Sequence, residues 1–193
     1  MKRSNGEIRS VKIGEQVWMA QNLDVTSFRN GDSIPEAKTA EEWTRFGTEG
    51  KPAYCVFSND QGNQRKYGLL YNWYAVNDPR GLAPGGWHIP TDYEWTRLTV
   101  TLGGDMAAAL RMRSGDIAMT GKKNSNAGFS GLPGGARGSN GGFYGLGSHA
   151  CWWSSSPVSE SNAWVRVLDY VKVEITTLSF HKYSGVSVRC VKD

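Results

Sequence analysis

Residues 163–191 constrain the fold more than any other stretch of this chain. They are dense in β-branched and aromatic side chains and contain no proline, so they predict β-strands. In the first of these strands, Leu168 and Tyr170 fall on one face, and alternation places Val165 and Val167 on the other. A small antiparallel sheet usually gives one face to water, yet both faces here are apolar. Either a second layer buries both faces, or one face is a contact surface.

Length and composition describe one globular domain. The chain has 193 residues, 39% hydrophobic and 21% charged, which is enough to bury a substantial core. Its 24 glycines and 8 tryptophans are both high counts, typical of a loop-rich fold held by large aromatic side chains. We therefore expect a single domain over residues 1–193.

Charge and hydropathy argue against two classes of partner. The net charge of +4 is not gathered into a basic face interleaved with aromatic residues, so no nucleic-acid partner is expected. No apolar run approaches the roughly 18 residues that a membrane-spanning helix needs, so direct membrane insertion is not expected. Residues 1–7 lack the apolar segment of an export signal as written.

The cysteines offer no metal or redox motif. Cys55, Cys151 and Cys190 cannot all pair with one another, and none stands in a Cys-x-x-Cys spacing. With only three scattered histidines in addition, no zinc site and no cofactor are predicted. Two states stay open for Cys55 and Cys190: a disulfide in an exported protein, or two reduced thiols in the core.

Two capping boxes mark helix starts. Thr39 precedes Glu42 by three residues, and Thr91 precedes Glu94 in the same way. After the second box Trp95 and two leucines fall on one helical stripe, which predicts a helix packed on the core. A weaker helix is predicted over residues 105–113.

The remaining segments carry less specific patterns. Alternation over 7–20 predicts two strands turning at Gly14-Glu15, and 52–57 reads as a buried strand. The aromatic stretch 67–76 favours a short buried helix. Three segments are interpreted as loops, namely 58–66, 115–126 and the glycine-rich 129–143.

Six motifs occur in order along nearly the whole chain. They are Val17–Leu23, Tyr67–Val76, Gly86–Trp95, Phe129–Gly135, Trp152–Ser155 and Val188–Asp193. Together they resemble the Fibrobacter succinogenes major paralogous domain, which is related to the C-type lectin-like fold in the branch of the formylglycine-generating enzymes. The resemblance implies an α+β fold with small twisted antiparallel sheets, two main flanking helices, long loops, and paired N- and C-terminal strands.

The resemblance extends to proteins whose C-terminal codons are diversified by retroelements. It implies that residues 1–126 are mainly scaffold and that 127–193 carry a recognition region, diversified in such relatives. The side chains that this implies for ligand contact are Tyr144, Ser148, His149, Cys151, Val165, Val167, Asp169, Val171, Glu174, Thr176, Leu178, Phe180, His181 and Tyr183. The competing interpretation is that the valines form a second buried face.

The expected function is therefore non-enzymatic binding of a protein or cell-surface ligand by a monomer. The expected location is extracellular or at the cell surface, with the export signal outside this chain, or on a phage virion. One alternative is a catalytic relative of the formylglycine-generating enzymes, which use two late cysteines, here Cys151 and Cys190. Another is a purely structural surface domain. His88 is interpreted as structural, and Trp152, Trp153 and Trp164 as core anchors.

Overall fold

The computed structural model describes residues 8–113 and 127–193, and the predicted loop 115–126 lies outside the described residues. The helices are α1 (Ala40–Thr48), α2 (Gln61–Tyr67), α3 (Trp73–Val76), α4 (Asp92–Thr101) and α5 (Asp105–Met112), with a short 3-10 turn η1 (Phe57–Asn59). The strands are β1 (Ser10–Ile13), β2 (Gln16–Met19), β3 (Tyr54–Cys55), β4 (Leu70–Tyr71), β5 (Trp87–His88), β6 (Gly134–Arg137), β7 (Phe143–Leu146), β8 (His149–Pro157), β9 (Asn162–Asp169), β10 (Glu174–His181) and β11 (Val191–Lys192). The fold is thus α+β.

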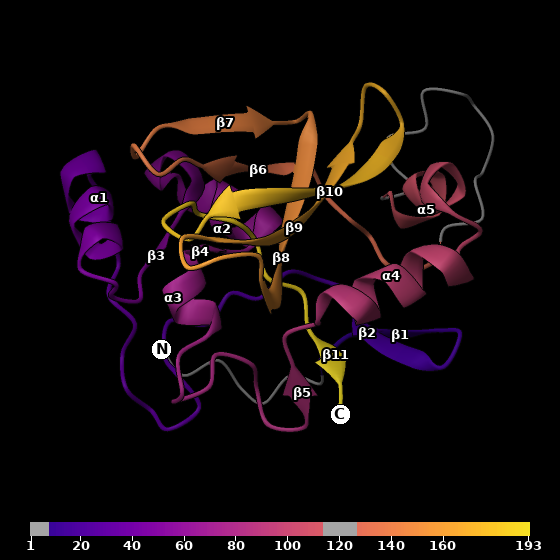
Figure 1. Cartoon of the computed structure of the whole chain (residues 1–193), viewed down its shortest axis with the longest axis horizontal. Coiled ribbons are helices and arrows are strands. Elements are labelled where there is room, and N and C mark those ends of the chain that lie inside the picture. Colours follow the sequence, from indigo (N-terminus) through magenta and orange to yellow (C-terminus); the bar gives the residue numbers. More distant parts are fainter. Residues whose placement is uncertain (1–7, 114–126) are drawn as a thin grey trace.

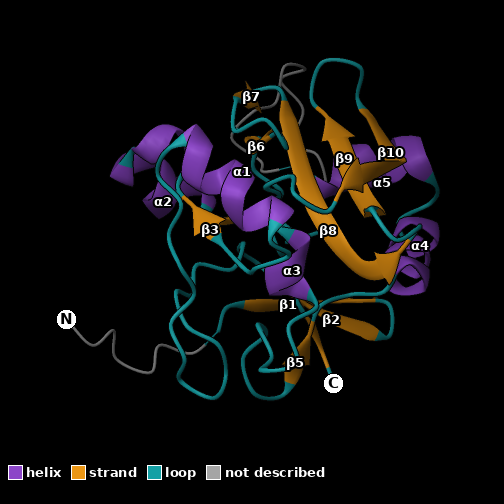
Figure 2. Ribbon diagram, turned by 60° about the vertical axis from the view of Figure 1, so that its left-hand side comes forward, coloured by secondary structure: helices purple, strands orange, loops and turns teal. Residues whose placement is uncertain are grey.

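A curved sheet of five strands in the order β10-β9-β8-β6-β7 forms the middle of the molecule (Figure 1). Figure 2 shows the long strand β8 bending beside β9 and β10, with α4 and α5 on one side and α1, α2 and α3 on the other. A second sheet has the order β1-β2-β11-β5. In it Val191 pairs with Trp18, so the predicted pairing of N- and C-terminal strands is confirmed.

Both predicted capping boxes are present. The hydroxyl of Thr39 accepts from the amide of Glu42, and that of Thr91 accepts from the amide of Glu94. Each glutamate carboxylate accepts a hydrogen bond from the backbone amide of its threonine. Together these bonds satisfy backbone amides that the start of a helix otherwise leaves unpaired. Helices α1 and α4 therefore begin where the sequence indicates.

Three sequence predictions of secondary structure are wrong, at least in part. Residues 58–66 are not all loop, because α2 begins after Asp60, whose carboxylate accepts from Gly62. The stretch 129–143 contains β6, where Gly135 at φ +68° allows the backbone to pass β7 closely. The stretch 67–76 splits into β4 and α3. Tertiary pairing overrides local pattern in each of the last two.

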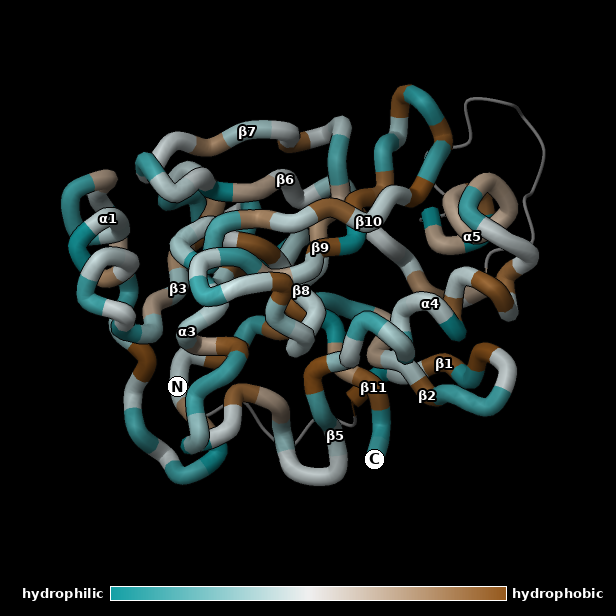
Figure 3. Tube along the Cα trace, in the orientation of Figure 1, coloured by the Kyte–Doolittle hydropathy of each residue, from teal (hydrophilic) through white to brown (hydrophobic). Residues whose placement is uncertain are grey.

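The core has two large clusters, one on each face of the five-stranded sheet. Trp18, Trp95, Trp152 and Phe129 centre the cluster under α4 and α5, and each is no more than 1% exposed. The rings of Trp18 and Trp95 lie 4.7 Å apart. The other cluster contains Trp153 with residues from β4, α3, β9 and the C-terminal segment. In Figure 3 brown, hydrophobic residues alternate with teal, hydrophilic ones along the β1–β2 hairpin.

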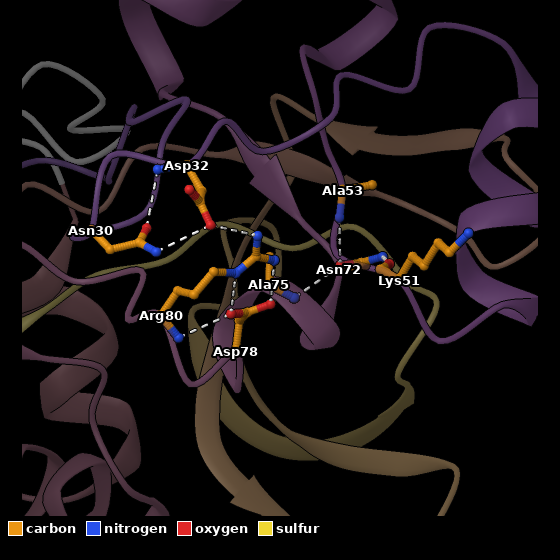
Figure 4. A network of polar contacts seen from close by, with 8 residues as sticks. All are labelled: Asn30, Asp32, Lys51, Ala53, Asn72, Ala75, Asp78 and Arg80. Carbon is orange, nitrogen blue, oxygen red and sulfur yellow. Dashed lines mark hydrogen bonds and ion pairs between the residues drawn. The ribbon is translucent and has the colours of Figure 1, made fainter.

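A buried asparagine ties residues 51–53 to the start of α3 (Figure 4). The side-chain oxygen of Asn72 accepts from the amides of Ala53 (3.0 Å) and Ala75 (3.1 Å). Its amide group donates to the carbonyl of Lys51 at 2.8 Å. Because Asn72 is only 1% exposed, water cannot replace these partners.

A second group in Figure 4 is a cluster of ion pairs at the surface. The guanidinium of Arg80 donates to both carboxylate oxygens of Asp78 at 2.8 Å and to Asp32 at 3.2 Å. It also lies 4.1 Å above the ring of Phe28. These bonds lower the pKa of Asp78, where the bond from Arg80 is the largest cause. These contacts hold the 28–32 turn against the 78–81 turn.

Candidate functional site

The predicted contact residues of the C-terminal region fall in rows across β8, β9 and β10. Strand pairing aligns His149 with Asp169 and Glu174, and it aligns Cys151 with Val167 and Thr176. A third row holds Trp153, Val165 and Leu178. Residues directly opposite in an antiparallel pair share a face, so these rows lie on one face of the sheet.

Three of the predicted contact residues are not accessible, which corrects the prediction. Cys151 is 5% exposed, Val165 0% and Val167 6%. They pack in the cluster that contains Tyr71 and Val186, which cover this face of the sheet. The competing interpretation of a second buried face is therefore right for β9. Alternation assigned the two faces correctly, since Arg166, Leu168 and Tyr170 are buried on the other side, but it could not show that both are covered.

The other predicted residues stay at least partly accessible. Most of them form two groups on either side of this buried centre, whereas Tyr144 lies on β7 at the opposite edge of the sheet. Tyr144 is 50% exposed, Val171 78% and Leu178 44%. Half-buried positions are Ser148, His149, Asp169, Glu174, Thr176, Phe180, His181 and Tyr183.

The first group surrounds the β7–β8 and β9–β10 turns. The hydroxyl of Ser148 lies 2.8 Å from Nδ1 of His149, whose Nε2 lies 3.6 Å from Asp169. Backbone hydrogen bonds from Lys172 and Val171 lower the pKa of Asp169, with Lys172 the largest cause. These contacts hold the β7–β8 turn against the β9–β10 turn.

The order serine, histidine, aspartate invites comparison with a catalytic triad. The Ser148 hydroxyl lies 3.1 Å from the carbonyl of Gly145 and 2.8 Å from Nδ1 of His149, so its one proton can go to either acceptor. The distance of 3.6 Å between Nε2 of His149 and the Asp169 carboxylate is longer than a hydrogen bond. The hydrogen bond to aspartate that orients the histidine of a triad is therefore not formed.

The second group is aromatic and lies at the other end of β10. The rings of His181 and Tyr183 are 4.1 Å apart, and the ring of Tyr74 in α3 is 6.0 Å from Tyr183. A Cβ placed on Gly47 of α1 would come within 2.7 Å of Tyr183, so α1 packs closely against this ring. The group presents a half-buried aromatic surface beside α1 and α3.

The strand between the groups, β10, forms the outer edge of the sheet. Its pairing with β9 is continuous over eight residue pairs, from Glu174–Asp169 to His181–Asn162. The amide of Lys182, one residue beyond β10, donates to the carbonyl of Ser161 at 2.8 Å. In an antiparallel pair, amides that point to the partner strand alternate with amides that point away from it. Even-numbered amides of β10 therefore point to β9.

The odd-numbered amides point outward. Those of Thr177 and Ser179 have no hydrogen-bond acceptor within residues 8–113 and 127–193, and both residues are exposed. At the start of β10, Ile175 is 3% exposed and packs in the cluster beneath α5. The open part of the edge therefore begins after Ile175. An edge with free donors and acceptors, no proline and no bulge is able to pair with another strand.

The cysteines have no accessible thiol. Cys55, Cys151 and Cys190 are all free and buried, so they are the reduced core thiols left open by the sequence. Burial raises the pKa of each to about 12. Within the ranges that the structure describes, no group of three His, Cys, Asp or Glu side chains could hold a metal ion. In the same ranges no helix has the length and apolar character needed to span a bilayer.

Sequence reasoning missed a basic cleft on another part of the molecule. It is lined by Arg9, Arg65, Lys66 and Arg189, together with Asn22 and several other polar residues. The pair Arg65-Lys66 was the only local signal in the sequence. The fold, rather than any continuous motif, brings these cations together.

Fold and site define an α+β domain with a curved sheet, an open edge strand and covered faces. The chain belongs to the Fibrobacter succinogenes major domain family, which it matches over residues 11–192. The family expected from the six motifs is thereby confirmed. No curated protein matches the chain.

Proposed function

We propose that this protein is a non-enzymatic binding module with a C-type lectin-like scaffold, and that it recognises a protein ligand through the open edge of β10. The observation that carries the proposal is the eight-pair, bulge-free ladder whose outward amides at Thr177 and Ser179 have no acceptor among the described residues. An extended ligand segment can add to such an edge by main-chain hydrogen bonds.

Side chains beside the edge would provide specificity. Leu178, 44% exposed, offers an apolar contact, and Thr176 lies in the next row on the same face. The two groups described above flank the edge with an imidazole and a carboxylate at one end and aromatic rings at the other. This mixture fits a protein segment better than a neutral sugar, because it combines apolar contact with a few directional hydrogen bonds.

The family resemblance also supports a diversified recognition region on an extracellular, cell-surface or virion protein. The burial of β9 limits where variation is tolerated, since core substitutions are costly. We infer that diversified positions would be the exposed ones of β10 and the adjoining turns, with Val165 and Val167 kept apolar. Sequencing this region in many isolates tests the inference, and frequent polar residues at Val165 would contradict it.

The catalytic alternative is supported less well. Formylglycine-type chemistry uses reactive cysteines, whereas burial here raises the pKa of Cys151 and Cys190 to about 12. A purely structural surface domain has no need of an open edge beside the exposed side chain of Leu178. Binding through β10 therefore remains the function that the geometry favours.

The test is a selection of random linear peptides on the purified protein, followed by affinity measurements on edge variants. Ser179→Pro removes an outward donor without touching the ladder to β9, and Ser179→Ala is the matched control that keeps the amide. We expect the proline variant to weaken the selected peptides about tenfold or more and the alanine variant to bind like the wild type.

Two results would count against the proposal. Peptides that bind both variants equally would show that the edge is not used. A wild-type protein that forms a dimer, and becomes monomeric on Ser179→Pro, would show that a second copy occupies the edge. Sedimentation velocity separates that outcome from binding of a foreign segment.

A further inference from the structure

A cleft of about 930 Å³ lies away from the β10 edge. Its walls come from the start of β1, the segment that follows β2, the end of α2 and the loop 128–132. Its volume falls in the range of small-molecule binding sites, roughly 300–1,000 Å³. No residue predicted from the sequence as a ligand contact lines it.

The lining carries a marked excess of positive charge. Arg9, Arg65, Lys66 and Arg189 are its cations, and Asp24 is its one carboxylate. Among the described residues none of these four cations forms an ion pair. Clefts lined by one sign of charge concentrate field and attract ions of the opposite sign.

Arg189 belongs to the lining and is a buried cation with neutral partners. It is 1% exposed, and its guanidinium donates to the side-chain oxygen of Asn22 at 2.6 and 3.1 Å. Its remaining bonds go to backbone carbonyls, those of Met19 (3.2 Å) and Phe129 among them. Desolvation lowers its pKa to about 9, which still leaves it charged at neutral pH. A fixed positive charge therefore lies at the cleft, and no described carboxylate neutralises it.

Asn22 holds this cation in place rather than offering itself to a ligand. Its oxygen also accepts from the indole of Trp152 at 2.9 Å, and its amide donates to the carbonyl of Tyr67 at 2.8 Å. The guanidinium is thus rigid, and it adds positive charge to the cleft without a direct bond to a ligand.

The dipole of helix α2 accounts for only part of the positive charge in the cleft. Arg65 and Lys66 stand in the last turn of α2, where cations stabilise the helix dipole. Arg9 and Arg189 belong to other segments and have no such role.

We propose that this cleft binds an acidic oligosaccharide, with carboxylates paired to Arg9, Arg65 and Lys66. Gln21, Gln64 and Ser130 line the same cleft and can bond sugar hydroxyls. The half-buried ring of Tyr67 also lines the cleft, with Nζ of Lys66 over it at 5.0 Å from its centre. A single cleft with one aromatic ring lacks the series of stacking platforms that single-stranded nucleic acid uses.

Isothermal titration with a tetrasaccharide of galacturonic acid tests the proposal. Its fully methyl-esterified form has the same shape without the charges, and inorganic sulfate supplies charge without the sugar. We expect saturable binding of the acid alone, weakened about tenfold when salt rises from roughly 0.05 to 0.5 M. Arg9→Gln/Arg65→Gln should reduce this affinity about tenfold or more.

A matched variant removes the same charge elsewhere. Arg45→Gln/Arg97→Gln replaces two exposed arginines that do not line the cleft, and it should bind like the wild type. Equal losses in both double variants would show that only net charge matters. Equal binding of the methyl ester or sulfate, tighter binding of a short oligothymidylate, or no binding of the acid would each overturn the proposal. Thermal melts of all variants confirm that they are folded.

Discussion

Val165 of β9 and Leu178 of β10 lie directly opposite each other, yet Val165 is 0% exposed and Leu178 is 44% exposed. They share one face of the sheet, where the cluster around Trp153 buries Val165 but leaves Leu178 exposed, while Phe180 of β10 packs against the cluster as a half-buried side chain. The boundary between core and surface therefore runs between Val165 and Leu178. This boundary decides which C-terminal residues can contact a ligand.

This pair gives the first prediction. Val165→Ser should lower the free energy of unfolding by about 3 kcal/mol, because it removes buried methyl groups and buries a hydroxyl. Leu178→Ser should change it by only about 0.5 kcal/mol, as partly exposed substitutions usually do. Urea unfolding measures both, and similar losses in the two variants would place the boundary elsewhere.

Trp95 provides a test of the helix–sheet core. It is 0% exposed, lies 4.7 Å from Trp18, and donates from its indole to the carbonyl of Trp153 at 3.3 Å. Trp95→Ala should cost about 3–5 kcal/mol, as for a large buried aromatic. Thr91→Ala, which removes the cap of the same helix, should cost only about 1 kcal/mol. An unchanged melting temperature for Trp95→Ala would contradict this packing.

Asn72 tests the buried polar link in Figure 4. Asn72→Ala should lower stability by about 3 kcal/mol, because the amides of Ala53 and Ala75 lose their shared acceptor inside the protein. Asn72→Asp keeps that acceptor but places an oxygen against the carbonyl of Lys51. It should therefore be destabilised most at neutral pH and recover in acid, where a protonated carboxyl can donate. Chemical unfolding at two pH values checks both variants.

His88 makes stability depend on pH. Partial burial acts to lower its pKa, but bonds to Glu94 (2.7 Å) and Asp193 (2.8 Å) outweigh burial and raise it. The folded state therefore binds the proton more tightly than the unfolded state. The resulting stabilisation is complete below the unfolded pKa of about 6.5 and is lost as pH rises through the raised folded pKa.

The measurement is the difference in unfolding free energy between wild type and His88→Gln across this pH range. We expect the difference to shrink steadily as pH rises. When both proteins also carry Asp193→Asn, which leaves the Glu94 bond in place, this difference should fall less steeply with pH. A difference that is constant with pH would mean that His88 contributes only packing.

The cysteines predict slow thiol chemistry. Because burial raises the pKa of all three to about 12, the native protein should not react with a thiol reagent at pH 8 on the timescale of free cysteine. All three should react once the protein is unfolded. Cys151→Ser should be destabilising, contrary to what its position in a predicted surface suggested, because it buries a hydroxyl in an apolar cluster. A native thiol that reacts at once would favour the catalytic alternative.

Local patterns in the sequence were enough to predict several elements and the family. Thr39–Glu42 and Thr91–Glu94 define their helices because capping involves residues only three apart. The β1–β2 hairpin follows from alternation, and the strands within residues 163–191 follow from their density of β-branched and aromatic side chains. Six ordered motifs identify the family.

Only the tertiary structure decided what covers those elements. Alternation gave the two faces of β9 but could not show that residues 186–190 and β4 cover the face with Val165 and Val167, since that packing joins residues far apart in the chain. The cleft arises in the same way, from Arg9, Arg65, Lys66 and Arg189, which no sequence window contains together. Strand order likewise made β10 an edge. Periodicity reports the direction of a side chain, whereas burial and charge clustering depend on which distant segments the folded chain places beside it.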